Sequence, residues 1–195
     1  MTTQRVSFAG KIIETTVTDK ASVAEDWVSQ IRSSYNGVQR INVGLDCEWR
    51  PHAISFMSNK TATLQLCIND KCLILQLFYM DYIPQSIKDF LNDPTFTFVG
   101  IEVADDAAKL RNEYGLNCSS TADIRQLAKN RWPSRFRRPG LKDLAFEVVG
   151  LRMAKPRNVT MSNWENRELT PAQIEYGCID AYASYRIGHK LIIEM

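Results

Sequence analysis

The sequence contains few of the residues that build zinc sites and disulfide frameworks. Its 195 residues include only two histidines and five cysteines, and no two cysteines have Cys-x-x-Cys spacing. An odd number of cysteines cannot all pair within one chain, and so few histidines argue against a Cys/His zinc centre. We therefore expect reduced, mostly buried thiols in an intracellular protein, with the cytoplasm favoured over the nucleus.

Long apolar runs and an excess of one charge are also absent. No stretch reaches the roughly 20 apolar residues that span a bilayer, and the N-terminus lacks the apolar run of a signal peptide, so no membrane partner is expected. The formal net charge is only +2, so any surface that binds a polyanion must be local. A hydrophobic content of 45% suits one sizeable core, and we expect a single domain over residues 1–195.

The alternation of apolar and polar residues predicts a sheet that begins with a hairpin and continues as an antiparallel meander. The hairpin turns at Gly10, and the meander consists of three successive strands, the first of which carries Asp46. The expected strands cover residues 6–17 as a hairpin, then 41–48, 61–68, 72–78 and 95–99.

Helical spacing of apolar residues, together with end signals, predicts the helices. Ser22 and Glu25 have the spacing of a capping box, and Thr170 with Gln173 has the same spacing around Pro171 at the first helical position. The expected helices cover residues 22–34, 84–92, 104–114, 121–129, 140–149 and 170 nearly to the C-terminus. A mixed sheet with helices packed on it is typical of an α/β fold.

Two carboxylates follow the first strand of the meander. Ile41, Val43 and Leu45 alternate as a buried strand requires, and Asp46 and Glu48 then occupy alternate positions. Alternate residues of a strand lie on one face, so the two carboxylates repel unless a cation lies between them. A hard divalent ion such as Mg²⁺, which prefers oxygen ligands, would meet this need. The alternative is an edge strand that ends in two solvated acids.

Two further groups of acidic residues lie in predicted helices. Asp105 and Asp106 fall in a first helical turn, where the helix dipole by itself favours carboxylates. Tyr176 and Asp180 are four residues apart in the last helix and therefore share a face. Asp180 lies on an apolar stripe, where a carboxylate is costly without a partner. A metal shared with the two strand carboxylates would supply that partner.

Taken in order, these residues resemble a known family. The set Asp46-x-Glu48, Asp106 and Tyr176-x-x-x-Asp180 is similar to the DEDD 3′–5′ exonucleases of the tyrosine subgroup, in their Werner syndrome-like and ribonuclease D-like branch. The resemblance covers residues 40–193 and includes the segments 43–49, 63–67, 98–100, 106–110 and 162–182. Asp106, rather than Asp105, fits the family's Asp-x-x-Lys-Leu pattern. Gly177 departs from the alanine that usually follows the tyrosine.

The resemblance implies a ribonuclease H-like fold and two-metal hydrolysis of phosphodiester bonds, with Mg²⁺ or Mn²⁺ as the two ions. In that scheme Asp46 would bridge both ions. Glu48 and Asp180 would hold the ion that carries the attacking water, and Asp106 would serve the leaving-group ion. Tyr176 would orient the water and help to deprotonate it. The four carboxylates are thus the expected metal ligands, and with Tyr176 they are the expected catalytic residues.

The resemblance also implies a substrate, the 3′ ends of single-stranded nucleic acid. Residues 46–51 and 61–67 look like the small plant Werner-exonuclease-like proteins, which include exoribonucleases that interact with the RNA-induced silencing complex. This similarity favours RNA over DNA and makes an RNA-silencing protein a candidate partner. The alternatives are a DNA-repair 3′–5′ exonuclease of the Werner type and a catalytically silent module that binds nucleic acid or protein.

Residues 129–138 form a basic stretch with two aromatic rings and no acid. Basic side chains neutralise phosphates, and aromatic rings stack on bases. The alternatives are a loop whose rings anchor it to the core, or a contact between subunits of a homo-oligomer. The expected nucleic-acid-binding residues are Trp49, Arg131, Trp132, Arg135, Phe136, Arg137 and Arg138. A second basic group consists of Arg152, Lys155 and Arg157.

Overall fold

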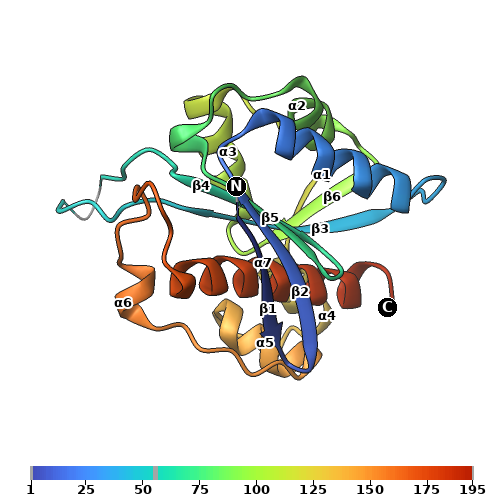
Figure 1. Cartoon of the computed structure of the whole chain (residues 1–195). Coiled ribbons are helices and arrows are strands. Elements are labelled where there is room, and N and C mark those ends of the chain that lie inside the picture. The colour runs from blue at the N-terminus through green and yellow to red at the C-terminus, as the bar shows by residue number, and fades with distance from the viewer. Residues whose placement is uncertain (1, 55–56, 195) are drawn as a thin grey trace.

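The computed structural model describes residues 2–54 and 57–194. In these residues a mixed sheet runs through the molecule, and helices cover both of its faces (Figure 1). The strands are β1 (Thr2–Phe8), β2 (Lys11–Thr18), β3 (Ile41–Glu48), β4 (Thr63–Ile68), β5 (Lys71–Leu75), β6 (Phe96–Gly100) and β7 (Thr121–Asp123). The helices are α1 (Ala21–Ser34), the 3-10 helix η1 (Leu77–Tyr79), α2 (Gln85–Asn92), α3 (Val103–Tyr114), α4 (Ile124–Arg131), α5 (Leu141–Val149), α6 (Arg157–Thr160) and α7 (Pro171–Ile192).

The strand order in the sheet is β1-β2-β5-β4-β3-β6-β7. β1 and β2 form the expected hairpin, and β3, β4 and β5 form the expected antiparallel meander. The hairpin joins the meander through a parallel pairing of β2 with β5, and β6 and β7 extend the sheet in parallel beyond β3. β3 continues past its last pair with β6, Gly44–Val99. Its acidic end therefore lies where the chain leaves β6 for α3.

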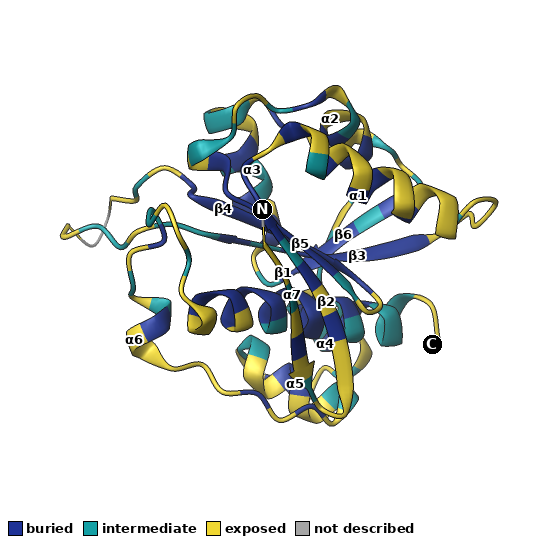
Figure 2. Cartoon of the chain, in the orientation of Figure 1, coloured by how far each residue is buried: buried dark blue, intermediate teal, exposed yellow. Residues whose placement is uncertain are grey.

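Two hydrophobic cores lie on the two faces of the sheet. Figure 1 shows α1, α2 and α3 on one face, and α4 to α7 on the other. On β3, Val43 and Leu45 are fully buried in the first core. The alternate residue Asn42 faces α7, because its Nδ2 donates a hydrogen bond to the carbonyl of Tyr185 at 2.9 Å. Figure 2 shows that burial is concentrated in the sheet and in α7. Alternation in β3 thus directs Asp46 and Glu48 toward the α7 side.

α7 lies unusually close to the sheet. It begins with the predicted capping box, in which the Thr170 hydroxyl accepts from the Gln173 N–H and Gln173 Oε1 accepts from the Thr170 N–H. A Cβ added to Gly44 of β3 would lie 1.9 Å from the carbonyl oxygen of Ala181. Only glycine allows this approach of strand and helix backbones. The contact brings Asp180 over the acidic end of β3.

Three local expectations were wrong in detail. α1 begins at Ala21, so Ser22 lies inside the helix; the carboxylate of Asp81 accepts the Ala21 N–H at 2.9 Å and takes the place of the expected capping box. Residues 121–123 form β7, because pairing with β6 outweighs their helical pattern, and α4 begins after them. The strand expected to reach residue 78 ends at Leu75, after which the chain turns through η1.

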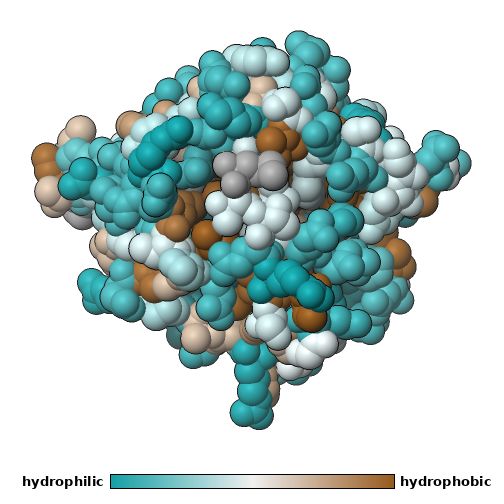
Figure 3. All heavy atoms as spheres, in the orientation of Figure 1, coloured by the Kyte–Doolittle hydropathy of each residue, from teal (hydrophilic) through white to brown (hydrophobic). Residues whose placement is uncertain are grey.

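One face of the molecule, drawn in Figure 3, carries mainly polar side chains with scattered apolar residues. All five cysteines are free, and four of them are buried, as expected. No helix within the described ranges combines the length and apolarity that crossing a bilayer requires.

Candidate active site

Three carboxylates converge beneath α7. Asp46 and Glu48 lie at the end of β3, and Asp180 lies on the face of α7 that rests on the strand. One oxygen of each lies within 4.8 Å of the others. The alternation of β3 and the glycine contact at Gly44 are the two structural causes of this convergence. Such a set of oxygens is suited to a hard divalent cation.

The electrostatics of the cluster also favour a cation. Burial raises the pKa of Asp46 well above its ordinary value, and the charge of Glu48 adds to the effect. Burial and the neighbouring Asp180 raise the pKa of Glu48 to about 8. Burial raises the pKa of Asp180 as well, although Lys155 opposes the rise. The protein therefore holds these groups together against their desolvation and repulsion, which a bound cation would relieve.

Asp106 lies beside this cluster but is not one of the three mutually close carboxylates. It is in the first turn of α3 and is only 8% exposed, whereas Asp105 is exposed. Burial, followed by the charge of Asp105, raises the pKa of Asp106 to about 7. Its charge in turn raises the pKa of both Asp46 and Glu48. Of the two neighbouring aspartates, Asp106 is therefore the one that faces the site.

Tyr176 is held at the edge of the cluster by the segment before α7. Its hydroxyl accepts a hydrogen bond from the Thr160 hydroxyl at 2.9 Å, and its ring lies 5.8 Å from that of Trp164, between ring centroids. Trp164 is 1% exposed, in agreement with a packing role. Burial raises the pKa of Tyr176, and Asp180 raises it further. Tyr176 is thus a neutral phenol, fixed in orientation, one helical turn from Asp180.

Lys155 is the site residue that sequence reasoning missed. Its Nζ lies 2.5 Å from Asp180 Oδ2, and it lies 5.2 Å from the centroid of the Tyr176 ring. Burial alone would lower the pKa of Lys155, but the ion pair with Asp180 outweighs burial and raises it. In the sequence this lysine belongs only to a basic group with Arg152 and Arg157, because a lysine in an irregular segment carries no signal of its spatial partner.

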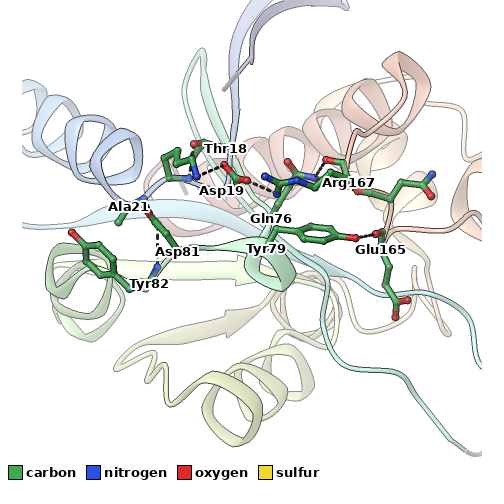
Figure 4. Close-up of polar contacts among 11 residues, drawn as sticks. Thr18, Asp19, Ala21, Gln76, Tyr79, Asp81, Tyr82, Glu165 and Arg167 are labelled. Carbon is green, nitrogen blue, oxygen red and sulfur yellow. Dashed lines mark hydrogen bonds and ion pairs between the residues drawn. The ribbon is translucent and has the colours of Figure 1, made fainter.

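A second polar network fastens the segment that supports Tyr176 (Figure 4). The Tyr79 hydroxyl donates to the Glu165 carbonyl at 2.5 Å, and Gln76 Nε2 donates to the Arg167 carbonyl at 3.1 Å. Arg167 also forms an ion pair with the buried Asp19. These contacts tie residues 165–167 to η1 and to the end of β2. They therefore fix the chain that follows Trp164.

The predicted nucleic-acid-binding residues of the basic stretch 129–138 are only partly free to contact a ligand. Phe136 is 7% exposed and packs in the second core, so its ring anchors the loop and is not free to stack on a base. Trp132 is half-buried beside it. Arg135 forms an ion pair with Glu147 at 2.5 Å. The remaining predicted arginines, Arg131, Arg137 and Arg138, are exposed.

The ring of Trp49, which was also predicted to bind nucleic acid, is not fully free to stack on a base. It is half-buried against the first core, and the Nζ of Lys109 lies 4.6 Å from the centroid of its ring. Lys109 also bonds the carbonyl of Asn59 at 3.1 Å. One side of the Trp49 ring is therefore committed to contacts within the protein.

Comparison with known sequences places the chain among exonucleases. A family model described as 3′-5′ exonuclease matches residues 15–195. A 3′-5′ exonuclease of Arabidopsis thaliana is 34% identical over 147 residues, which cover 74% of this chain and 50% of the relative. The bifunctional 3′-5′ exonuclease/ATP-dependent helicase WRN of Mus musculus is 28% identical over 156 residues, which cover 76% of this chain and 11% of the relative. The chain spans about half the length of the Arabidopsis protein and a smaller share of WRN.

Solved structures agree with the predicted fold. RNase D of Escherichia coli, described as an exoribonuclease involved in structured RNA processing, matches with a TM-score of 0.75 at 18% identity, over 92% of this chain and 44% of that one. The EXD2 exonuclease domain, soaked in Mn, matches with a TM-score of 0.53 at 25% identity, over 91% of this chain and 89% of that one. The seven-stranded sheet and its helices therefore have the ribonuclease H-like fold of these exonuclease domains, as predicted.

Proposed function

Because the chain belongs to the 3′-5′ exonuclease family, we propose that it removes nucleotides from the 3′ end of single-stranded nucleic acid, with RNA favoured, by metal-dependent hydrolysis of the terminal phosphodiester. The observation that carries the proposal is the convergence of Asp46, Glu48 and Asp180 within 4.8 Å, next to an oriented tyrosine. A module that only binds nucleic acid would have no need to hold three repelling carboxylates together beside a buried phenol.

The residues fit a divalent metal centre. Members of this family depend on divalent metals, and the clustered carboxylates supply hard oxygen ligands. Asp46, Glu48 and Asp180 would hold Mg²⁺ or Mn²⁺, and Asp106 would serve a second ion position. Bound there, two such ions would acidify the attacking water and neutralise charge on the scissile phosphate.

The chain's own residues would position the reactants. A free tyrosine has a pKa near ~10 and is a weak base at neutral pH. Tyr176 is better suited to orient the water, because its hydroxyl keeps one hydrogen-bonding direction for Thr160. Lys155 forms an ion pair with Asp180 and so offsets part of the negative charge of the cluster. Its side chain is 32% exposed, so its ammonium is within reach of a bound phosphate as well.

The choice of RNA rests on the resemblance of residues 46–51 and 61–67 to the plant exoribonucleases. A DNA-repair exonuclease of the Werner type is the second candidate, and the match to WRN favours it. An RNA-silencing protein partner is part of the proposal for the same reason as RNA, whereas a homo-oligomer is the alternative role of the basic stretch 129–138. Nucleic-acid binding by the loop 131–138 stays a prediction that depends on the exposed Arg131, Arg137 and Arg138.

The test is a set of time courses with 3′-labelled and 5′-labelled substrates. Single-stranded RNA, single-stranded DNA and recessed duplex ends are offered in parallel, with Mg²⁺, with Mn²⁺ and with EDTA. We expect stepwise shortening from the 3′ end, fastest on single-stranded RNA, and no cleavage with EDTA. Asp46→Ala should lose activity while it keeps the circular dichroism of the unsubstituted protein. Cleavage by Asp46→Ala in EDTA would refute the metal mechanism, and faster cleavage of recessed DNA would favour the second candidate.

A further inference from the structure

α5 has two sides of opposite charge. Asp143 and Glu147 line a hollow together with Arg135, Arg137 and Arg138, and Glu147 forms an ion pair with Arg135. These two acids are four residues apart and therefore share one side of the helix. They lower the positive charge that the loop offers to a polyanion. The loop is thus a partly neutralised surface, despite its sequence.

The other side of α5 is basic and aromatic. Lys142 and Phe146, again four residues apart, line a second hollow of about 460 Å³ together with residues 151–154. Phe146 is 47% exposed, which is uncommon for so large an apolar side chain. The guanidinium of Arg152 lies 5.3 Å from the centroid of its ring. A cation above an exposed aromatic ring presents both a phosphate partner and a stacking face.

This side of α5 leads directly to the catalytic cluster. Residues 148–164 contain no acid, and the chain passes from Arg152 to Lys155, whose Nζ contacts Asp180. Three extended residues span at most about 10 Å, so the backbone of Arg152 lies within that distance of the backbone of Lys155, and the Lys155 side chain spans the remaining distance to Asp180. Figure 1 shows the connection from α5 to α6 running alongside α7 toward its N-terminal end. Arg157, at the start of α6, is exposed on the same connection.

We propose that Lys142, Phe146 and Arg152 form the surface that holds the single strand just upstream of its 3′ end. The inference rests on the proposed function and adds the path of the substrate. The two cations neutralise backbone phosphates, and a base stacks on the exposed face of Phe146. Lys155 continues the cationic track to the scissile phosphate. The occupant is a single strand, because an exposed ring can stack only on an unpaired base.

Binding without turnover tests this surface. A labelled single-stranded RNA octamer is titrated by fluorescence anisotropy against Asp46→Asn protein at several salt concentrations. Lys142→Ala with Arg152→Ala should raise the dissociation constant about tenfold and reduce the salt slope by roughly two, because two phosphate contacts are lost. Phe146→Ala should raise the dissociation constant about fivefold or more and leave the salt slope unchanged. Lys88→Ala, an exposed lysine of α2 on the opposite layer, should change neither.

The same assay separates the competing outcomes. A paired Arg137→Ala and Arg138→Ala variant provides an equal loss of charge in the loop after α4. If that pair weakens binding while the Lys142 and Arg152 pair leaves the constant and the slope unchanged, the α5 surface is refuted and the exonuclease proposal stands. If the unsubstituted protein neither binds nor shortens any oligonucleotide, both proposals fail.

Discussion

At the scale of single residues, the candidate active site is a group of acids, two half-buried and one buried, whose charges oppose folding. Asp46, Glu48 and Asp180 have raised pKa values because burial and mutual repulsion disfavour their charged forms. Lys155 offsets part of this repulsion through Asp180. If these three positions served stability alone, apolar side chains or fully paired charges would be expected at them. Retained repulsion of this kind indicates a site shaped for a cation.

Asp106 and Asp105 offer a direct test of which carboxylate serves the site. Asp106→Ala should lower kcat by about a hundredfold or more, because it removes a buried acid beside the proposed metal ligands. Asp105→Ala should lower it less than about threefold, since Asp105 is exposed and acts only on its neighbour. Single-turnover rates measure both effects at saturating metal. The reverse order of the two rates would assign the site to Asp105.

Thr160 is expected to act as a positioning residue for Tyr176. Thr160→Val removes the hydrogen bond to the phenol and should lower kcat about fivefold with little change in KM, which corresponds to a hydrogen bond of ~1 kcal/mol. Thr160→Ser should restore the rate. In a Tyr176→Phe background, Thr160→Val should have no further effect, as a double-mutant cycle requires for coupled residues. Additive losses would mean that Thr160 acts independently of Tyr176.

At the scale of secondary-structure elements, the separation between α7 and the sheet determines the site. Gly44 permits backbone contact with Ala181, and Gly188 lies against Val99, where an added Cβ would be 2.6 Å away. Gly177 faces the buried Gln65, whose Nε2 would lie 3.0 Å from an added Cβ. An alanine at position 177, as in the family pattern, would therefore require the Gln65 side chain to shift slightly. Two glycines of α7 and one of β3 therefore hold Asp180 over Asp46.

Gly44→Ala should displace α7 and disrupt the site. The added methyl would meet the Ala181 carbonyl at 1.9 Å, and overpacking of this kind costs about 1–3 kcal/mol. We expect a lower midpoint of urea unfolding and a loss of exonuclease activity larger than the loss of stability explains. Gly140→Ala is the control, because its nearest neighbour would lie at an ordinary 3.7 Å. If the two substitutions had equal effects on stability and activity, the contact of Gly44 with α7 would not be what determines the geometry of the site.

The elements that sequence reasoning placed well are those whose signals are local. Thr170 and Gln173 cap α7 as their spacing indicates, and Gly115 ends α3 with φ +67°. The strand with Asp46 and Glu48 was recognised because alternation is visible within a few residues. Burial of Asp106 agrees with the choice that the motif favoured over Asp105.

The elements that were missed depend on partners distant in sequence. α1 takes its end contact from Asp81, sixty positions away, so Ser22 was misread as a cap. β7 exists because Phe98 of β6 pairs with Thr121. Lys155 belongs to the site only through Asp180, and Phe136 is buried only because α4 and α5 pack around it. Local patterns carry no information about such contacts.

At the scale of the whole molecule, the site joins the two layers of the fold. Asp180 comes from α7 on one face of the sheet, Asp106 from α3 on the other face, and Asp46 from the strand between them. Tyr79 and Gln76 also fasten residues 165–167, which follow the residues that contact Tyr176. A cation held by these groups would therefore cross-link elements that otherwise meet through the sheet. Metal binding and global stability should be linked.

Removal of metal should accordingly lower thermal stability, and neutralisation of Asp46 should abolish most of that dependence. Mg²⁺ or Mn²⁺ at 100 times its dissociation constant should stabilise the protein by about 2.7 kcal/mol relative to EDTA. Asp46→Asn should raise the melting temperature in EDTA, by roughly 1 kcal/mol of unfolding free energy, because it removes a carboxylate that is desolvated and that repels Glu48. The same variant should gain little from added metal and should not cleave. Calorimetry in both conditions measures all three effects, with exposed Asp105→Asn as the control. An Asp46→Asn protein that is less stable in EDTA, yet keeps the full metal-induced gain, would show that the carboxylate serves packing and binds no metal.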